Sequence, residues 1–166
     1  MKKEQLVLFF IIILFTCWVN LCVNTVSAQH IMASTAELTE EAENIVRGTV
    51  KDMKSKWNDE KTFIWTFVTV SVTETTKGDS LDKQDITVKI PGGVVENVGQ
   101  RSDDEVVFEK GEDVLLFLKK EMYKEKEYFQ VVRLFMGKYT FKDDEVVEKK
   151  VPVKAFMDEI KKAMKK

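Results

Sequence analysis

The clearest pattern in the chain runs from Phe63 to Gly78, where β-branched and aromatic residues predominate. This composition is typical of a β-strand, in which successive side chains point to opposite faces. One face carries the apolar side chains Ile64, Val68, Val70 and Val72. The opposite face begins with Phe63, Trp65 and Phe67 and turns polar from Thr69 onward. The pattern predicts a long strand buried first on both faces and then on one, as in a sheet that curls into a small barrel.

Shorter segments with alternating or apolar patterns are predicted as further strands. They cover residues 45–50, 85–90, 105–108, 114–118, 128–135 and 138–142, with a short edge strand at residues 145–149. The run Val114–Leu118 has no polar break, which is typical of a central strand buried on both faces. Gly48, inside the first of these strands, indicates a bulge or a closely packed neighbour.

Three segments between the predicted strands are expected to be loops or turns. Residues 51–61 and 119–127 are rich in charged side chains, and residues 94–102 show no clear period. Neither feature indicates a half-buried strand, which would alternate apolar and polar side chains.

Helical patterns occur at the two ends of the domain. Ser34 followed three residues later by Glu37 has the form of a capping box, and we expect a short helix from there through about Asn44. Near the C-terminus, residues 153–165 place apolar side chains on one side and charged ones on the other, which predicts an amphipathic helix. We expect its apolar face to cover the aromatic face of the long strand.

The N-terminal segment has the form of a secretory signal. Lys2 and Lys3 precede an apolar run, and Val26-Ser27-Ala28 places small residues where cleavage before Gln29 would occur. The apolar run is also about long enough, at roughly 18 to 20 residues, to span a bilayer. Residues 1–28 are therefore either a cleaved signal peptide or a membrane anchor. Both alternatives place the single domain at residues 29–166 outside the cytoplasm.

The cysteine positions and the charge balance limit the kinds of stabilisation and of partner that we expect. Both cysteines, Cys17 and Cys22, lie in the apolar run. The domain at residues 29–166 therefore has no cysteine to form a disulfide bond, and its hydrophobic core has to stabilise it. Residues 29–166 carry 24 basic and 27 acidic side chains with interspersed signs, so we expect no nucleic-acid partner. A membrane contact is expected only through the N-terminal segment, if it is not cleaved.

The chain has few residues suited to catalysis or metal binding. Its single histidine, His30, stands two positions after the predicted cleavage site, and no cysteine follows it. Nucleophiles that depend on histidine, and Cys/His zinc sites, are therefore not expected. The acidic runs at residues 103–105 and 143–145 lack the ligand spacing of a calcium loop and are interpreted as solvated turns. We predict no cofactor. The sequence does not exclude acid–base catalysis by two carboxyl groups, but it does not indicate which two would act together.

Three residues are candidates for binding a partner. Trp57 stands in a charged segment, and tryptophan is enriched among interface anchors. The alternative is that Trp57 folds back onto the core. Gly92 and Gly93 are further candidates, although a tight turn after Pro91 is the favoured interpretation, because the Lys-Ser/Thr pair of a phosphate-binding loop is missing.

A family pattern runs through nearly all of residues 29–166. It consists of Ala42–Val50, then Trp57, then the long strand ending in Thr76-Lys77-Gly78, then Gly92-Gly93, Phe108–Leu118 and Gly137-Lys138-Tyr139. In this pattern the chain resembles a family of small exported prokaryotic β-domains that has no assigned activity.

More distantly, the order of a strand Ile45–Val50, a loop, a long strand ending in Lys77-Gly78 and a further strand is similar to netrin-like modules and tissue inhibitors of metalloproteinases. Those are five-stranded OB-type barrels with a packed helix, so the resemblance implies a barrel here. The inhibitors place an N-terminal cysteine on the target's metal ion, and residues 29–166 contain no cysteine. The resemblance therefore transfers no functional residue.

Together these patterns predict a mainly β domain, an OB-like small barrel with a short N-terminal helix and an amphipathic C-terminal helix. The leading hypothesis for its function is a noncatalytic extracytoplasmic interaction module that binds a protein or cell-surface partner. One alternative is a secreted protease-inhibitor-like protein, which would present residues 94–102 as an exposed rigid loop or edge. The other is a carboxylate-based hydrolase or transferase, which would gather carboxyl groups with perturbed pKa values in one cleft.

Overall fold

The computed structural model describes residues 32–101, 106–123 and 125–165, which belong to one compact unit. The predicted signal peptide or anchor, both cysteines, His30 and the acidic run at residues 103–105 lie outside the described residues. The unit is mainly β. Its long elements are β1 (Asn44–Trp57), β2 (Ile64–Lys77), β3 (Asp85–Pro91), β6 (Asp113–Tyr123) and β7 (Lys126–Val131). Two helices, α2 (Thr35–Glu41) and α3 (Val153–Ala163), stand near the two ends of the unit's sequence.

Five strands close on one another through backbone pairing. β1 pairs with β2 along most of its length and with β6 through residues 44–49, so the order β1-β2-β3-β7-β6 returns to β1. Within the described residues, β3 and β7 form the one parallel pair, at Val88 and Phe129; the other pairs are antiparallel. β6 also pairs with β8 (Lys138–Lys142), which continues the sheet to the short strands β9 (Glu145–Val146) and β10 (Val151–Pro152).

The expectation of loops at residues 51–61 and 119–127 was wrong for most of these residues. β1 continues to Trp57 and β6 continues to Tyr123. In residues 51–57 of β1, the backbone of Lys54 and Lys56 pairs with that of Phe67 and Trp65. The side chains of both lysines are exposed to solvent. Backbone pairing keeps these charged segments in strands although their β-propensity is low. Their charged side chains can face water, because an antiparallel sheet needs to be covered on one face only.

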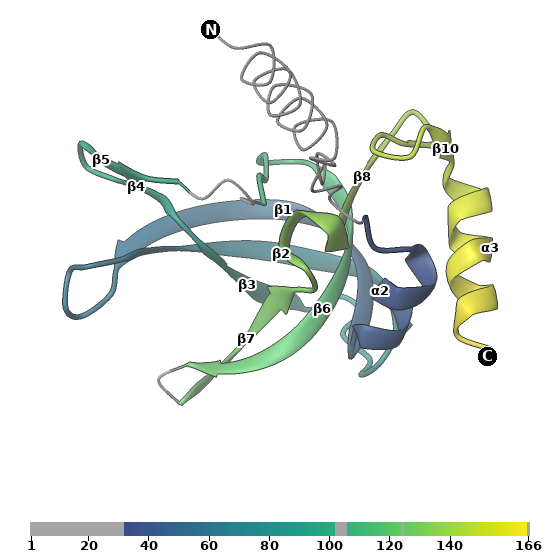
Figure 1. Ribbon diagram of the computed structural model, residues 1–166, viewed down its shortest axis with the longest axis horizontal. Helices are drawn as coiled ribbons and strands as arrows, with labels where there is room; N and C mark the ends of the chain where they lie inside the picture. Colours follow the sequence, from purple (N-terminus) through teal and green to yellow (C-terminus); the bar gives the residue numbers. More distant parts are fainter. Residues whose placement is uncertain (1–31, 102–105, 124, 166) are drawn as a thin grey trace, which may run out of the picture. The chain divides into compact units, whose positions relative to one another are not determined.

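Three other predicted segments also differ in the structure. The segment expected as an excursion loop contains a hairpin of β4 (Gly93–Val95) and β5 (Val98–Gln100), which projects from the sheet (Figure 1). Residues 106–109 are described without strand structure, although residues 105–108 were predicted as a strand. The strand predicted at residues 128–135 ends at Val131, and a 3-10 helix, η1 (Leu134–Gly137), follows. Arg133 and Leu134 have φ values of 49° and 54°, and such left-handed backbone interrupts a strand.

The apolar side chains form two clusters on the two sides of the sheet. The first lies inside the ring of five strands and contains Val46, Val68, Val88 and Leu116. The second contains Leu38 of α2, Phe156 and Ile160 of α3, and Leu115 and Phe117 of β6. Figure 1 shows α2 and α3 side by side at the end of the sheet away from the β1–β2 turn. The expectation that α3 covers the aromatic face of the long strand was therefore wrong: α3 packs against α2, β9 and β10, and its Phe156 ring packs against Tyr139 of β8.

The capping box predicted at the start of α2 is present. The Glu37 amide donates to the Ser34 hydroxyl over 3.2 Å, and the Ser34 amide donates to the Glu37 carboxylate over 2.8 Å. At the other end, the Lys77 ammonium donates to the carbonyl oxygens of Thr39 and Ala42, each over 2.6 Å. These bonds satisfy carbonyl groups that the end of a helix leaves unpaired. The end of β2 is thereby tied to α2.

Gly48 confirms the expected bulge and close packing. The register between β1 and β2 shifts between Arg47 and Gly48, and a Cβ at Gly48 would clash with the carbonyl oxygen of Ser71. We expect Gly48→Ala to lower the free energy of unfolding by about 1–3 kcal/mol, as overpacking does. Urea unfolding measures this change. The matched control is Gly99→Ala in β5, where an added Cβ meets its nearest atom at 3.8 Å and we expect a change within about 0.5 kcal/mol. Equal losses in both variants would contradict the packing argument.

Ionisation of Tyr139 makes the free energy of unfolding depend on pH in the alkaline range. Burial raises its pKa from 10.0 to about 12, and the carboxylates of Glu148 and Glu159 add to this increase. The unfolded chain releases the phenol proton near pH 10 and the folded protein only near pH 12, so stability is lost as the pH rises through this interval. We expect a loss of up to about 2–3 kcal/mol from Tyr139 by pH 12. Tyr139→Phe removes this part of the pH dependence, and urea unfolding of both proteins at pH 9 and pH 11.5 checks it. Parallel losses in the two proteins would contradict the assignment.

Candidate functional site

A cleft of about 260 Å³ lies on the outer face of the sheet. Its walls are the aromatic side chains of Trp65 and Phe67 on β2, Tyr123 on β6 and Tyr128 on β7. We call this site the aromatic cleft. Lys56 and Trp57 from the end of β1 and Asp59 from the β1–β2 turn complete its lining. Residues that are far apart in the sequence therefore meet at one surface.

Strand alternation explains why these side chains share a face. On β2, Ile64, Thr66 and Val68 are buried, so Trp65 and Phe67 point outward and stay half-buried. On β7, Phe129 is buried in the interior cluster, which turns Tyr128 outward. Tyr123 lies two positions after Glu121, the residue that pairs with Tyr128, so Tyr123 emerges on the same face.

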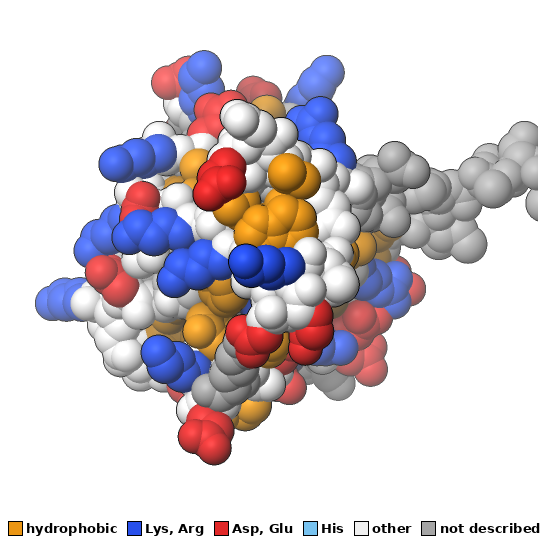
Figure 2. Space-filling model, turned by 90° about the vertical axis from the view of Figure 1, so that its left-hand side faces the viewer, with side chains coloured by type: hydrophobic (Ala, Val, Ile, Leu, Met, Phe, Trp, Pro, Cys, Tyr) orange, Lys and Arg blue, Asp and Glu red, His pale blue; other side chains and the backbone are white. Residues whose placement is uncertain are grey.

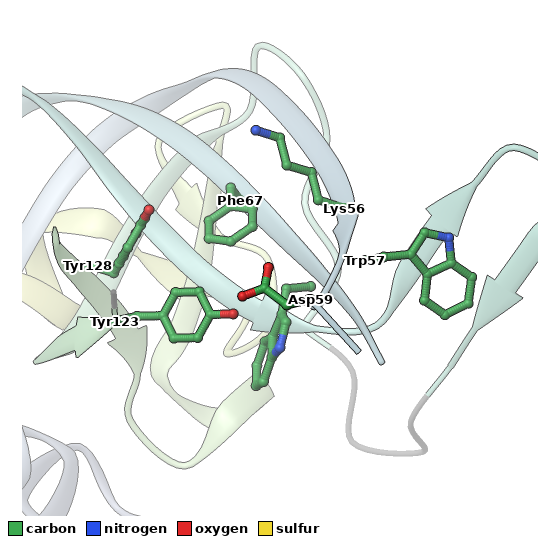
Figure 3. A pocket seen from close by; sticks show the side chains of 7 residues that line it. Lys56, Trp57, Asp59, Phe67, Tyr123 and Tyr128 are labelled. Atoms are coloured by element: carbon green, nitrogen blue, oxygen red, sulfur yellow. The ribbon is translucent and has the colours of Figure 1, made fainter. Parts of the chain in front are cut away.

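The aromatic rings are inclined to one another. The ring centroids of Phe67 and Tyr128 lie 5.3 Å apart with the planes at 50°, and those of Tyr123 and Tyr128 lie 6.1 Å apart at 63°. Figure 3 shows the Asp59 carboxylate pointing toward the space between Phe67 and Tyr123. The surface is therefore concave, with aromatic walls and a charged acceptor between them, unlike a flat apolar patch.

Lys89 on β3 contacts two of the aromatic walls of the cleft. It is 3 % exposed, and its ammonium lies 4.0 Å from the ring centroid of Trp65 and 4.1 Å from that of Tyr123. The same ammonium donates to the carboxylate of Glu121 over 3.0 Å, and the Gln130 amide donates to the other oxygen of that carboxylate over 2.6 Å. A buried charge needs such partners, and here they also fix the positions of two rings.

The β1–β2 turn, which carries Asp59, is held by the side chain of Asn58. The Asn58 carbonyl oxygen accepts hydrogen bonds from the amides of Thr62 at 2.8 Å and Phe63 at 3.0 Å. The backbone amide of Asn58 donates to the Phe63 carbonyl oxygen over 2.8 Å, and the side-chain amide of Asn58 donates to the Thr62 hydroxyl over 3.0 Å. Asparagine is favoured in turns for this ability to bond to nearby backbone groups. Asp59 is therefore presented from an ordered turn.

The structure places the three predicted binding residues differently. Trp57 ends β1 opposite Ile64, and in Figure 3 its indole points away from Phe67 and Tyr123. Trp57 therefore lines the edge of the cleft. Gly92 and Gly93 turn the chain from β3 into β4 with φ values of 87° and 129°, and Gly92 is buried. The turn accounts for glycine at both positions, and their assignment to partner binding stays a prediction.

A second cavity of about 210 Å³ adjoins the cleft. Trp65 and Lys89 border it, as do Pro91 at the end of β3, Gln130 on β7 and Leu134 in η1. β3 and β7 pair at one position, Val88 with Phe129, and the second cavity is lined by the residues that follow in both strands. Trp65 is thus a shared wall between two cavities.

Two further surfaces stand away from the cleft. A groove of about 680 Å³ runs along α2, the end of β2 and the end of α3, with Thr39, Lys77 and Met164 in its lining. The β4–β5 hairpin exposes Val94 by 66 % and Val98 by 50 %. The face at the left of Figure 1, shown in Figure 2, has exposed hydrophobic side chains among interspersed basic and acidic ones.

Among the described carboxyl groups with a shifted pKa, every shift is downward. Hydrogen bonds lower the pKa of Glu37 (from Ser34), Glu41 (from Arg133), Asp52 (from Lys54) and Asp85 (from Lys51). For Glu112, burial favours a raised pKa, but hydrogen bonds from Lys138 and Thr140 outweigh it and lower the pKa. These groups are ionised at neutral pH, whereas a general acid needs a raised pKa.

In the residues that the structure describes, no three or more His, Cys, Asp or Glu side chains gather as they would around a metal ion. Within that part, no helix has both the length and the apolar character that crossing a membrane requires.

Comparison of the chain with models of known protein families and with curated protein sequences finds no match. The aromatic cleft therefore has to be interpreted from its own geometry and chemistry.

Proposed function

We propose that the domain is a noncatalytic extracytoplasmic interaction module that binds a protein or cell-surface partner in the aromatic cleft. The observation that carries this proposal is the group of half-buried rings of Trp65, Phe67, Tyr123 and Tyr128. The buried Lys89 ammonium packs against two of them, Trp65 and Tyr123, and Tyr128 in turn packs against Tyr123 and Phe67. Large aromatic side chains that stay partly exposed and are already ordered lose little entropy when a partner covers them.

An OB-like barrel is part of the proposal. The strand order β1-β2-β3-β7-β6 with return to β1, and the parallel pairing of β3 with β7, support a five-stranded Greek-key barrel of this type. OB-folds bind ligands on the face of their second and third strands and at the loops after the first and fourth strands. The cleft occupies the corresponding place, since Trp65 lies on β2, Asp59 lies in the β1–β2 turn, and Tyr123 and Tyr128 flank the β6–β7 turn.

Two further features support a noncatalytic role outside the cytoplasm. Residues 29–166 contain no cysteine and one histidine. Among the carboxyl groups that the structure describes, every resolved pKa shift favours the ionised form. The basic start, apolar run and small residues of the N-terminal segment favour export. Under this proposal the domain holds a partner at the cell surface or in the medium.

Affinity capture tests the proposal. The protein, purified after export, is immobilised and challenged with surface and secreted components of the cells that produce it. We expect a saturable partner that is lost with Tyr128→Ala and retained with Val94→Ser on the hairpin. A partner retained equally by both variants would contradict binding in the cleft.

A protease-inhibitor-like role is the second candidate, because the β4–β5 hairpin projects and exposes Val94 and Val98. The hairpin is anchored to the sheet where the Ile64 amide donates to the Gln100 side-chain oxygen over 2.7 Å. This role predicts a captured protease whose activity falls and whose binding is lost with Val94→Ser. The same experiment therefore separates the two functions.

A further inference from the structure

We propose that the aromatic cleft and the cavity beside it form one site for an uncharged oligosaccharide chain, an inference that rests on the proposed function. Trp65 borders both cavities, whose volumes of about 260 and 210 Å³ are similar. A ligand made of repeated units of equal size fits such a pair of cavities. The site is assigned from its shape, its aromatic walls and its balance of charge.

The walls of the cleft suit a sugar ring. A β-linked pyranose has C–H faces that pack against aromatic rings, and hydroxyl groups around its edge that need hydrogen-bonding partners. Phe67 and Tyr128, inclined at 50°, provide ring surfaces, and Asp59 and Lys56 place an acceptor and a donor at the same cleft. A carboxylate has about four acceptor positions, so Asp59 can accept from a sugar in addition to its present contacts. Aromatic walls combined with a few directed polar groups are typical of small-ligand sites.

The charges around the site favour a neutral ligand. Lys89 is buried and paired with Glu121, so its charge is already compensated. Lys56 and Asp59, which line the cleft, carry opposite signs. A phosphate or uronate group would need a cation whose charge is not already compensated. Lys89 borders the second cavity, but its ammonium is paired with Glu121 and packed against the rings of Trp65 and Tyr123. Nucleic acids and acidic polysaccharides are therefore poor ligands for this site.

The arrangement of the two cavities favours a chain over a single compact group. The second cavity continues from Trp65 to Pro91, Gln130 and Leu134, where β3 and β7 diverge. A chain can place one sugar on each side of Trp65, whereas a single side chain of a protein partner fills one cavity. β2 pairs with β1 and β3 along its two edges, so a peptide cannot add as a strand beside Trp65 and Phe67.

Isothermal titration calorimetry with purified saccharides tests the inference. The probes are cellohexaose and chitohexaose as neutral β-linked chains, their disaccharides, and a hexamer of galacturonate as an acidic chain. We expect a neutral hexamer to bind at least about tenfold more tightly than its disaccharide, because it occupies both cavities. We also expect the galacturonate hexamer to bind at least about tenfold more weakly than the neutral one.

Variants in each cavity sharpen the test. Tyr128→Ala alters the first cavity and Leu134→Ala the second, and we expect each to weaken hexamer binding by about 5- to 30-fold, as loss of an anchor residue does. The disaccharide is expected to respond to one of the two variants only. Val94→Ala on the hairpin is the control that leaves both affinities unchanged.

Two results would overturn the inference. A galacturonate hexamer that binds as tightly as the neutral chains contradicts an uncharged ligand. The absence of binding of either neutral hexamer at concentrations up to about 1 mM, where the standard binding free energy is near −4 kcal/mol, contradicts a saccharide ligand. In that case a captured protein that is lost with Tyr128→Ala leaves the proposed function standing. If no partner depends on Tyr128, both proposals fail.

Discussion

Phe156→Ala is expected to lower the free energy of unfolding by about 3–5 kcal/mol, the usual cost of removing a buried aromatic ring. Phe156 is fully buried, and its ring centroid lies 4.6 Å from that of Tyr139. It joins α3 to the cluster that also contains Leu38 of α2 and Phe117 of β6. Urea unfolding followed by circular dichroism measures the loss as a lower midpoint at unchanged slope.

The control for Phe156 stands on the same helix. Lys154 is exposed on the other side of α3, and we expect Lys154→Ala to change the free energy of unfolding by no more than about 0.5 kcal/mol. A small loss with Phe156→Ala, close to that of the control, would mean that α3 contributes little to the fold. The second cluster would then have to be stabilised by the sheet and α2 alone.

Trp65→Ala is expected to weaken binding to envelopes of the producing cells by at least about 30-fold, equivalent to about 2 kcal/mol or more. Trp65 is the shared wall of the two cavities and one of the two rings that contact the Lys89 ammonium. Its removal takes away contact surface on both sides and releases Lys89 from one partner. Sedimentation of labelled protein with isolated envelopes gives the affinity.

Two matched variants separate this effect from loss of folding. Trp65→Phe keeps a ring between the cavities, and we expect it to retain most of the binding. Trp57→Ala removes an indole at the edge of the cleft that points away from Phe67 and Tyr123 in Figure 3, so we expect a much smaller loss than with Trp65→Ala. Circular dichroism shows whether each variant is folded. Equal losses with Trp57→Ala and Trp65→Ala would place the binding surface along the edge of the sheet near Trp57.

The buried elements could be predicted from the sequence because apolar periodicity reports burial directly. The alternation at Ile64, Val68, Val70 and Val72 predicted β2, and all four side chains are buried. Periodicity failed where a strand lies mostly in solvent. Residues 51–57 and 119–123 carry charged side chains on their exposed face. Each pairs with the next strand of a hairpin, at residues 64–69 and 126–130, and the alternation within one segment does not reveal this cross-strand pairing.

The candidate site was only partly visible in the sequence. Trp65 and Phe67 were expected on one face of the long strand, but without a function. Tyr123 fell in a segment expected to be a turn, so its direction could not be assigned. The role of Lys89 could not be predicted, because its partners Glu121 and Trp65 lie 32 and 24 positions away in the sequence. Strand pairing, which alternation does not determine, brings these residues together.

Hydrogen–deuterium exchange of the exported protein, with and without solubilised envelope fragments, tests most directly whether ligands bind in the aromatic cleft. We predict slower exchange, at saturating fragment concentration, in the β1–β2 turn, β2, the end of β3 and the β6–β7 turn. The hairpin β4–β5 and the groove along α2 and α3 should exchange at unchanged rates. Protection confined to that hairpin or that groove would contradict binding in the cleft.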